Sequence, residues 1–425
     1  MKLFHQSPGV KILHADCLEM LRKLPDNSID SVITDPPYGL SNTTPAHVLE
    51  AMTAWVTGDR EFIPATSGGF MGKSWDNFVP PPAVWDEALR VLKPGGHLLC
   101  FAGTRTMGLM EMSMRLAGFD VRDSIAWLSG QGFPNGMDIG KVIDKAAGDE
   151  RHIVSEGTPV KRIIPGADQD KTGSWIKDNG RTFTPTVTEA ASEESRKWTG
   201  WNNALKPAFE PIIMARKPFK GPLFKNVLKH GTGALNVDTT RITGEPVPIN
   251  RLEKWSGFGE EKRPAYEQTM NTAGRYPANV ILDESQAAAL DEQTDSLKAG
   301  GAIAIGSKGA GVRNNAVYGV DDSDRGEWQP YGDAGGASRF FYCAKAGKSE
   351  RPVVDGKGHS TVKPLSLMRY LVKLVTPPNG LILEPFAGSG TTVEAALLEG
   401  FRIIASEREE EYLPLIVQRI ERVPS

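Results

Sequence analysis

Four consecutive residues, Asp35-Pro36-Pro37-Tyr38, form the first stretch of the chain that could do chemistry. They follow the β-type run Ser31–Thr34, so we expect them where a buried strand ends, which is the edge at which open α/β sheets bind ligands. The prolines fix φ and remove two backbone donors, so the turn presents mainly acceptors beside an aromatic ring. Such a site suits a planar ligand with an NH2 group, such as the exocyclic amine of a nucleobase. Two hydrogen bonds from this amine to fixed acceptors would let its nitrogen pyramidalise and aim its lone pair outward.

The same turn has a simpler interpretation. Asp-Pro-Pro is also a common surface turn, and Tyr38 would then be a half-buried packing residue. The four residues do not separate these interpretations, so the other motifs of the chain must decide.

A second stretch, near the end of the chain, has the layout of an adenosine-type cofactor site. An apolar run ending at Glu384 leads into Pro385-Phe386-Ala387-Gly388-Ser389-Gly390, and a helix and a second strand ending at Glu407 follow. The glycines let the backbone approach a ligand, and the later carboxylate can accept from ribose hydroxyls. Val393 stands where a dinucleotide site needs a third glycine, so S-adenosylmethionine is the better candidate. The alternative for Glu407 is a solvated carboxylate at the start of an acidic helix.

Composition limits the class of protein. The chain has 425 residues with 45 glycines and 30 prolines, which predicts more than one compact unit and long irregular segments. With a net charge of −3, any nucleic-acid surface must be a local basic region. The three cysteines lie far apart without metal-ligand spacing, so we expect no disulfide framework, no metal site and a cytoplasmic location. We expect no membrane span and no secretory signal.

The order of apolar runs predicts an α/β fold with a Rossmann-like, doubly wound and mostly parallel sheet. Asp16 with Glu19 resembles a capping box at the start of the first helix. The regular pattern lapses at 39–79, where we expect a binding loop, and again at 130–205 and 218–358.

His359-Ser360-Thr361-Val362-Lys363-Pro364 comes shortly before the glycine turn. In this order, the three motifs resemble the amino-methylating DNA methyltransferases of the β arrangement, a circularly permuted order in which the catalytic part precedes the cofactor part. Within that group the chain is most similar to solitary enzymes of bacteria, prophages and phages. The resemblance covers roughly 11–128, 208–218 and 340–420. It implies five segments: 1–129, a catalytic half; 130–205, an insertion; 206–217, the last strand of that half; 218–351, a target-recognition and DNA-binding region; and 352–425, a cofactor-binding half.

The resemblance also implies residue roles. Asp35 and the Pro36 carbonyl would hold the target amine, with Pro37 stiffening the turn and Tyr38 stacking on the flipped base. The S-adenosyl-L-methionine site would comprise Asp16, Cys17, Asp35, Thr361, Lys363, Glu384, Phe386, Gly388, Ser389, Gly390 and Glu407. Glu384 replaces the usual aspartate and Ser360 a common proline.

Contact with double-stranded DNA must come from local basic residues, because phosphate contacts need positive charge. The candidates are Lys217, Lys220, Lys225, Lys229, Arg241, Arg339, Lys345 and Lys348. The alternative is two solvated basic faces.

The resemblance favours methylation of adenine N6, because aspartate opens the catalytic motif. Methylation of cytosine N4, methylation of RNA, and a DNA-binding regulator without activity are the alternatives. Members of this group often pair, so we expect a homodimer.

Overall fold

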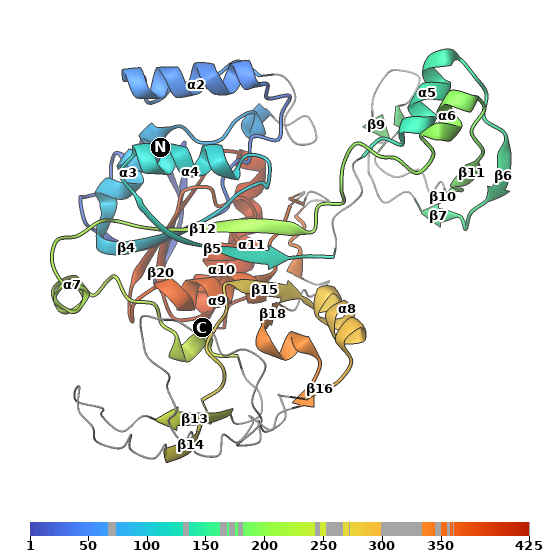
Figure 1. Ribbon diagram of the computed structural model, residues 1–425. Helices are drawn as coiled ribbons and strands as arrows, with labels where there is room; N and C mark the ends of the chain where they lie inside the picture. Colours follow the sequence, from blue (N-terminus) through green and yellow to red (C-terminus); the bar gives the residue numbers. More distant parts are fainter. Residues whose placement is uncertain are drawn as a thin grey trace, which may run out of the picture. The chain divides into compact units, whose positions relative to one another are not determined.

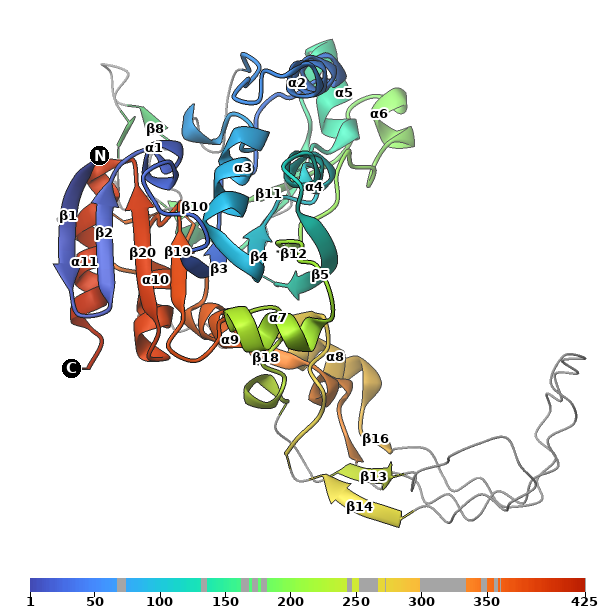
Figure 2. The ribbon, with the colours of Figure 1, turned by 90° about the vertical axis from the view of Figure 1, so that its left-hand side faces the viewer.

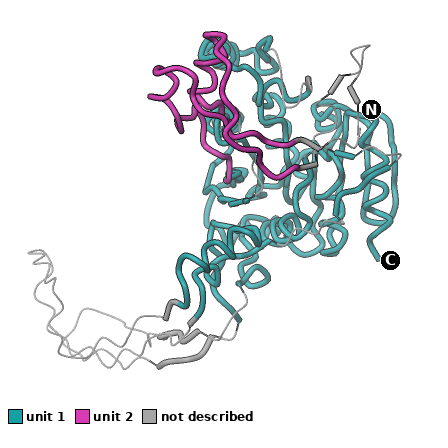
Figure 3. The backbone as a smooth tube through the Cα atoms, turned by 90° about the vertical axis from the view of Figure 1, so that its right-hand side faces the viewer, with its two compact units in different colours: residues 1–130, 209–425 teal, residues 131–208 magenta. Residues whose placement is uncertain are grey.

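A computed structural model gives the structure of most of the chain (Figure 1). It describes residues 1–66, 74–130, 136–161, 168–169, 175–176, 182–242, 247–251, 267–271, 273–298, 334–344, 350–354, 358–359 and 361–424. The chain divides into two compact units, 1–130 with 209–425 (unit 1) and 131–208 (unit 2), which Figure 3 colours separately.

Ten strands of the described chain form one sheet in unit 1, in the order β1-β2-β20-β19-β3-β4-β12-β5-β15-β18. In that order their bounds are Lys2–Ser7, Val10–His14, Arg402–Glu407, Leu381–Glu384, Ile29–Thr34, Leu92–Phe101, Phe209–Arg216, Asp120–Leu128, Val280–Asp283 and Tyr342–Ala344. Strands from the end of the chain, β19 and β20, therefore lie between two strands from its beginning. This order confirms a doubly wound sheet with permuted connections.

The sheet is mostly parallel, as expected, with two antiparallel members. β1 forms a hairpin with β2, and β12 pairs antiparallel with both β4 and β5. The direction of β12 places its first residues at the edge where the parallel strands end, which we name the carboxyl edge. The chain after β12 consequently continues at the opposite, amino edge.

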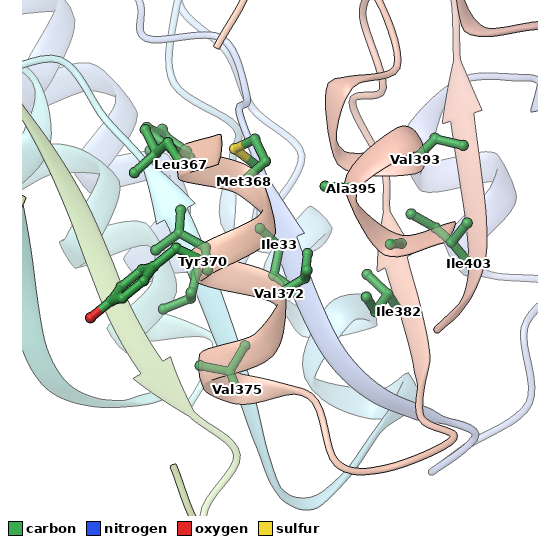
Figure 4. Packing of buried hydrophobic residues seen from close by; sticks show 14 of the residues in the cluster. Ile33, Leu367, Met368, Tyr370, Val372, Val375, Ile382, Val393, Ala395 and Ile403 are labelled. Carbon is green, nitrogen blue, oxygen red and sulfur yellow. The ribbon is translucent and has the colours of Figure 1, made fainter. Parts of the chain in front are cut away.

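Helices cover both faces of the sheet because successive strand residues point to opposite sides. Ile33, Leu99 and Ile382 face one apolar cluster with the helices α9 (Leu365–Val375), α10 (Thr391–Leu398) and α11 (Leu413–Glu421). Figure 4 shows Ile33 and Ile382 with the residues of α9 and α10. The neighbouring strand residues face a second cluster with α1 (Cys17–Leu21), α2 (Pro45–Thr57), α3 (Pro82–Val91) and α4 (Met107–Leu116). The result is a three-layer αβα arrangement.

The expectation of an irregular tract at 39–79 is wrong in part, because α2 occupies thirteen of its residues. Thr44 caps this helix, Pro45 takes its first position, and Ala51 and Trp55 are buried. Because only two positions in three turns are buried, the apolar residues of this helix show too weak a helical period to be recognised in the sequence. A short 3-10 helix, η2 (Ser74–Asp76), follows before α3.

The tract 218–358 is likewise less irregular than expected. Its described parts include α7 (Leu223–His230), the 3-10 helices η3 (Asp238–Thr240) and η4 (Ala337–Phe340), α8 (Glu284–Thr294), and the sheet strands β15 and β18. The two strands are only four and three residues long, below the length at which a period can be recognised. The short pairs β13 (Val247–Arg251) with β14 (Glu267–Asn271), and β16 (Leu297–Lys298) with β17 (Ala334–Gly335), lie outside the main sheet.

Unit 2 has helices α5 (Ile139–Ala147) and α6 (Glu193–Lys197). Its short strands are β6 (Ile153–Glu156), β7 (Val160–Lys161), β8 (Asp168–Gln169), β9 (Trp175–Ile176), β10 (Thr182–Phe183) and β11 (Thr186–Thr188). Asp144 is fully buried there, where it pairs with Arg151 and accepts from Ser192. Across both units, none of the described helices is long and apolar enough to cross a membrane.

Candidate active site and cofactor site

The predicted catalytic turn and the glycine turn come together at the carboxyl edge of the sheet. β3 ends at Thr34 and β19 ends at Glu384, and these strands are parallel neighbours with Leu383 opposite Val32. Residues about 350 positions apart therefore follow adjacent strand ends, as the hydrogen bond from Thr34 Oγ1 to Glu384 Oε1 (2.5 Å) shows directly.

Asp35 lies in a network of three other polar side chains. Its Oδ1 accepts from the Tyr38 hydroxyl (2.8 Å), and its Oδ2 accepts from the Lys363 ammonium (2.7 Å). Glu210, near the start of β12, accepts from the Tyr38 hydroxyl at 3.1 Å and lies 3.3 Å from Lys363 Nζ. Lys363 also lies over the rings of Tyr38 and Phe101, with Nζ 5.3 and 4.8 Å from their centroids.

The charges of this network are mutually dependent. Burial by itself would lower the pKa of Lys363, but the nearby Asp35 and Glu210 charges and hydrogen bonds to both outweigh it and raise the pKa. Burial raises the pKa of Tyr38 well above its ordinary value, and the two carboxylates raise it further. Lys363 is therefore a cation and Tyr38 a neutral donor at neutral pH.

Asp76 fixes the backbone beyond the catalytic turn and was not identified from the sequence. Its Oδ1 accepts from the backbone N–H of Tyr38 (2.7 Å) and Gly39 (3.0 Å), and its Oδ2 from that of Leu40 (3.2 Å). Gly39 has φ +68°, and a Cβ there would lie 3.0 Å from Val79 N, so the turn requires glycine. The buried Asp76 in η2 thus fixes the backbone on the side of the site where Tyr38 lies.

The glycine turn has the backbone conformation expected of it. Gly388 has φ +51° and Gly390 φ +81°, both in the region that favours glycine. The Gly388 N–H donates to Glu407 Oε2 (2.7 Å) from the adjacent strand β20. Ser389 beside them is buried, and Phe386 is partly buried in the cluster with α1–α4.

Glu407 is buried rather than solvated, so the alternative of an exposed helix start is wrong. It is 8% exposed, and burial raises the pKa of its carboxyl to about 7, although backbone N–H groups of Glu409 and Gly388 donate to it. A carboxylate held at a strand end in this way can accept from ligand hydroxyls.

Glu384 has a different environment. It is 1% exposed, and its oxygens accept from Thr34, from Thr392 Oγ1 (2.7 Å) and from the Phe386 N–H (3.0 Å). Burial raises the pKa of Glu384 to about 8, despite these donors. Its carboxyl group therefore ties the glycine turn to α10 and to β3. Thr34 and Thr392 are site residues that the sequence did not indicate, because hydroxyls on a strand and a helix carry no motif.

Asp16 follows β2, which pairs in parallel with β20, so it comes next to the end of β20. It caps α1 by accepting from the N–H groups of Leu18 (2.9 Å) and Glu19 (3.4 Å), both at Oδ1. The other half of the capping box is absent, because the Glu19 carboxylate pairs with the N-terminal amine of Met1. Cys17 is half-buried, and desolvation raises the pKa of its thiol to about 12.

His359 lies against the glycine turn, and Thr361 contacts His359. A Cβ at Gly388 would lie 3.4 Å from His359 Nε2, which is van der Waals contact. The His359 ring packs against Tyr412, with centroids 4.5 Å apart, and stacks with Trp75 at 6.4 Å. His359 Nδ1 lies 2.6 Å from the Thr361 carbonyl oxygen. Trp75 and Tyr412 had no sequence signal, since isolated aromatic residues usually pack in cores.

The predicted DNA-binding residues that the structure describes do not lie at this site. Lys217 Nζ donates to Asn27 Oδ1 and to the backbone carbonyl oxygens of Arg90 and Leu92. Leu92 begins β4, so these contacts lie at the amino edge. Six residues of β3 at about 3.3 Å each separate the two edges by roughly 20 Å.

Other members of this basic set also lie at the amino edge. Lys220, Lys225 and Lys229 are exposed on or beside α7, which Asn226 attaches to Pro94, and Figure 2 shows α7 below the sheet. Arg241 bonds to Asp238 and Arg339 lies over Phe340, just before β18 begins. Lys345 and Lys348 fall outside the described residues. The described basic residues follow β12 at the amino edge because β12 runs antiparallel, a direction that a single apolar run does not reveal.

Comparison with known proteins shows which family the chain belongs to. A family model described as "DNA methylase" (N6_N4_Mtase) matches residues 29–418. The chain belongs to this family. Among curated relatives of this DNA methyltransferase, the type II methyltransferase M.HindIII of Haemophilus influenzae is 23% identical over 436 residues, covering 96% of this chain and 94% of that protein. The putative methylase YubD of Escherichia coli is 43% identical over 65 residues, covering 15% of this chain and 29% of that protein.

Solved structures include similar chains. A putative DNA modification methylase from Thermus thermophilus, complexed with S-adenosyl-L-methionine, matches with a TM-score of 0.38 and 15% identity over 97% of this chain and 94% of that one. The PvuII DNA methyltransferase, described as cytosine-N4-specific, matches with a TM-score of 0.41 and 12% identity over 98% of this chain and 88% of that one.

The methyltransferase takes its methyl group from S-adenosyl-L-methionine, and its residues fit this cofactor. Gly388 and Gly390 give the turn after β19 two positions without side chains, and the buried Glu407 carboxylate lies at the end of the neighbouring strand. Within the described residues, no group of three or more His, Cys, Asp or Glu side chains is arranged to hold a metal ion.

Replacing Glu384 with Gln should reduce the pH dependence of stability. The pKa of Glu384 is about 8 in the folded chain against an ordinary value of 4.5, so between these values the folded state holds a proton that the unfolded state releases. The free energy of unfolding of the natural chain therefore falls as pH rises through this window. Urea denaturation at several pH values gives the free energy of unfolding of both chains. As pH rises through this window, that of the natural chain should fall relative to that of Glu384→Gln. A difference that stays constant with pH would contradict this.

Truncating Glu407 to Ala should weaken S-adenosyl-L-methionine binding by roughly 1–3 kcal/mol, the usual value of hydrogen bonds to a charged group. Glu407→Gln can still accept from the Gly388 N–H, so comparing the two variants separates support of the turn from contact with the ligand. Isothermal titration calorimetry measures both, with the exposed Glu421→Ala as control. Unchanged affinity in Glu407→Ala would refute the ribose contact.

Proposed function

We propose that this DNA methyltransferase transfers a methyl group to the N6 amine of an adenine flipped out of duplex DNA. The observation that carries the proposal is the position of the Asp35 carboxylate, at the end of β3 and beside the glycine turn at the end of β19. An amine held by Asp35 would lie next to the cofactor's reactive end. The aspartate that opens the catalytic motif supports adenine over cytosine by family resemblance.

The chain contributes orientation and a fixed acceptor site. When bound, S-adenosyl-L-methionine would supply an electrophilic methyl group, so that the N–C bond forms as the S–C bond breaks, sulfur keeps the electron pair and the methylated nitrogen releases one proton to solvent. Asp35 and the Pro36 carbonyl would accept hydrogen bonds from the two amine hydrogens, directing the nitrogen lone pair away from the ring. Their acceptor strength matters most as nitrogen gains positive charge, which is when preorganised groups lower the barrier. The Tyr38 ring would replace part of the stacking that the base loses when it leaves the duplex.

Cytosine N4 is the second candidate, because cytosine also offers an exocyclic amine to the same acceptors. Duplex DNA is proposed over RNA on the basis of the family. An inactive regulator is less well supported, because Asp35, Tyr38 and both turn glycines are present and brought to one edge.

Mass spectrometry of nucleosides from cells that express the chain tests both the reaction and the base. We expect N6-methyladenine in DNA from cells with the natural chain and a much lower level with Asp35→Ala. N4-methylcytosine without methyladenine would overturn the choice of base, and neither product would overturn the proposed reaction.

In single-turnover assays Asp35→Ala should slow methylation by roughly 10²–10³-fold or more, as expected for one preorganised group. Affinity for S-adenosyl-L-methionine should persist, since the glycine turn and Glu407 are untouched, and so should affinity for DNA. Near-normal turnover would refute the role of Asp35. Loss of all three properties would show instead that the substitution had disrupted the site.

We also propose that the target-recognition segment 218–351 contacts DNA. Lys220, Lys225 and Lys229 are exposed at the amino edge, so they are suited to phosphates away from the target base rather than beside it.

We further propose that the chain acts as a homodimer, as the enzymes that it resembles often do. Light scattering at micromolar concentration should give twice the monomer mass. A monomer both with and without DNA would contradict this.

A further inference from the structure

Asp35 has no free carboxylate oxygen in this structure. Oδ1 receives the Tyr38 hydroxyl at 2.8 Å and Oδ2 the Lys363 ammonium at 2.7 Å. Each oxygen keeps a second lone pair, but an oxygen that already accepts from one of these donors is a weaker acceptor for an incoming amine. Asp35 would hold the amine more strongly if at least one donor had another acceptor. Leaving the buried Lys363 charge without a partner is costly, so that alternative acceptor must already be close.

Glu210 is placed to be that acceptor. It is the second residue of β12, opposite Trp127 of β5, and the antiparallel direction of β12 brings it to the carboxyl edge. Its Oε2 accepts from the Tyr38 hydroxyl at 3.1 Å and lies 3.3 Å from Lys363 Nζ. Both donors that occupy Asp35 are thus already within reach of a second carboxylate.

The chemistry of the two donors allows an exchange. A tyrosine hydroxyl has one hydrogen and can donate fully to only one acceptor at a time, whereas an ammonium has three hydrogens and can bind two carboxylates together. The side chain of Glu210 is 35% exposed, against 10% for Lys363, so Glu210 has more freedom to move toward the donors. The Tyr38 hydroxyl and the Lys363 ammonium both lie slightly closer to Asp35 than to Glu210, so in this structure they bind mainly to Asp35.

We propose that Glu210 is a positioning residue that takes over the Tyr38 hydroxyl and the Lys363 ammonium when the target base enters, and thereby frees Asp35 to accept from the amine. No bond is made or broken in this step, and no proton changes owner. The Lys363 charge stays paired throughout. The inference rests on the proposed role of Asp35, but it does not depend on which base carries the amine.

The test compares Glu210→Gln, which keeps the shape and removes the charge, with Glu210→Asp, which keeps the charge on a shorter side chain. We expect the single-turnover rate of Glu210→Gln to fall about 10- to 100-fold, because a small misplacement of reacting groups can cost about 100-fold in rate. Affinities for S-adenosyl-L-methionine and DNA should be unchanged, because Glu210 would act only after the base has entered. Glu210→Asp should recover part of the rate. The exposed Glu421→Gln at the end of α11 is the matched control and should methylate normally.

A double-mutant cycle with Lys363→Met tests whether Glu210 acts through the ammonium, and unchanged cofactor affinity in Glu210→Gln shows that the site itself is intact. Once the ammonium is absent, Oδ2 of Asp35 no longer needs to be released, so adding Glu210→Gln should cost much less rate than it does in the natural chain. Interacting residues show such non-additivity, whereas independent ones add. Additive losses, or a normal rate in Glu210→Gln, would overturn the proposal. If Glu210→Gln binds no cofactor, Glu210→Ala takes its place in the cycle and is judged by the same criterion.

The natural chain in the same assay distinguishes this proposal from the proposed function. If the natural chain transfers no methyl group to DNA, the proposed function fails. If it does and the Glu210 variants keep their rate, only the exchange fails.

Discussion

The parallel pairing of β3 with β19 is the constraint on which the site depends. It joins a strand from residues 29–34 to one from residues 381–384 and aligns their ends, so that the catalytic turn and the glycine turn start side by side. Thr34, Glu384 and Thr392 then connect the two turns through buried hydrogen bonds. A shift of the register would move the two turns apart and point the neighbouring core residues to the wrong face of the sheet.

The antiparallel direction of β12 is a second constraint on the arrangement of the site. Because it runs against its neighbours, its first residues lie at the carboxyl edge, where Glu210 joins Asp35, Tyr38 and Lys363. Its last residues lie at the amino edge, and α7 with its lysines follows from there. The chain enters unit 2 after β5 and returns at the start of β12, so both connections to unit 2 leave from the carboxyl edge of unit 1.

Several carboxylates lie along this one edge, and each is made tolerable in a different way. Asp35 and Glu210 share the Lys363 ammonium, whereas Glu384 and Glu407 accept from hydroxyls and backbone N–H groups. Neutral donors offset the cost of burial less completely than a cation does, which agrees with the raised pKa of Glu384 and Glu407. Cofactor and base therefore meet at an edge lined by hydrogen-bond acceptors, which suits an amine that gains positive charge during the reaction.

The sequence by itself determined the features that local chemistry dictates. Short apolar runs with glycines or prolines at their ends located most strands of the sheet, and the left-handed conformations of Gly388 and Gly390 follow from a turn that no other residue adopts readily. Asp16 caps its helix as its residue type predicts. The motifs Asp35–Tyr38, His359–Lys363 and Phe386–Gly390 indicated a DNA methyltransferase that uses S-adenosyl-L-methionine, and membership of that family bears this out.

Only the tertiary structure decided the contacts that depend on strand direction and order. An apolar run such as Pro211–Met214 reads the same whether its strand is parallel or antiparallel, so the place of Glu210 in the site and that of the α7 lysines outside it were not readable. The same holds for Asp76, Thr34 and Thr392, whose partners lie far away in the sequence or in another layer. Residue types fix what a side chain can donate or accept, but the pairing of distant strands fixes which partners it meets.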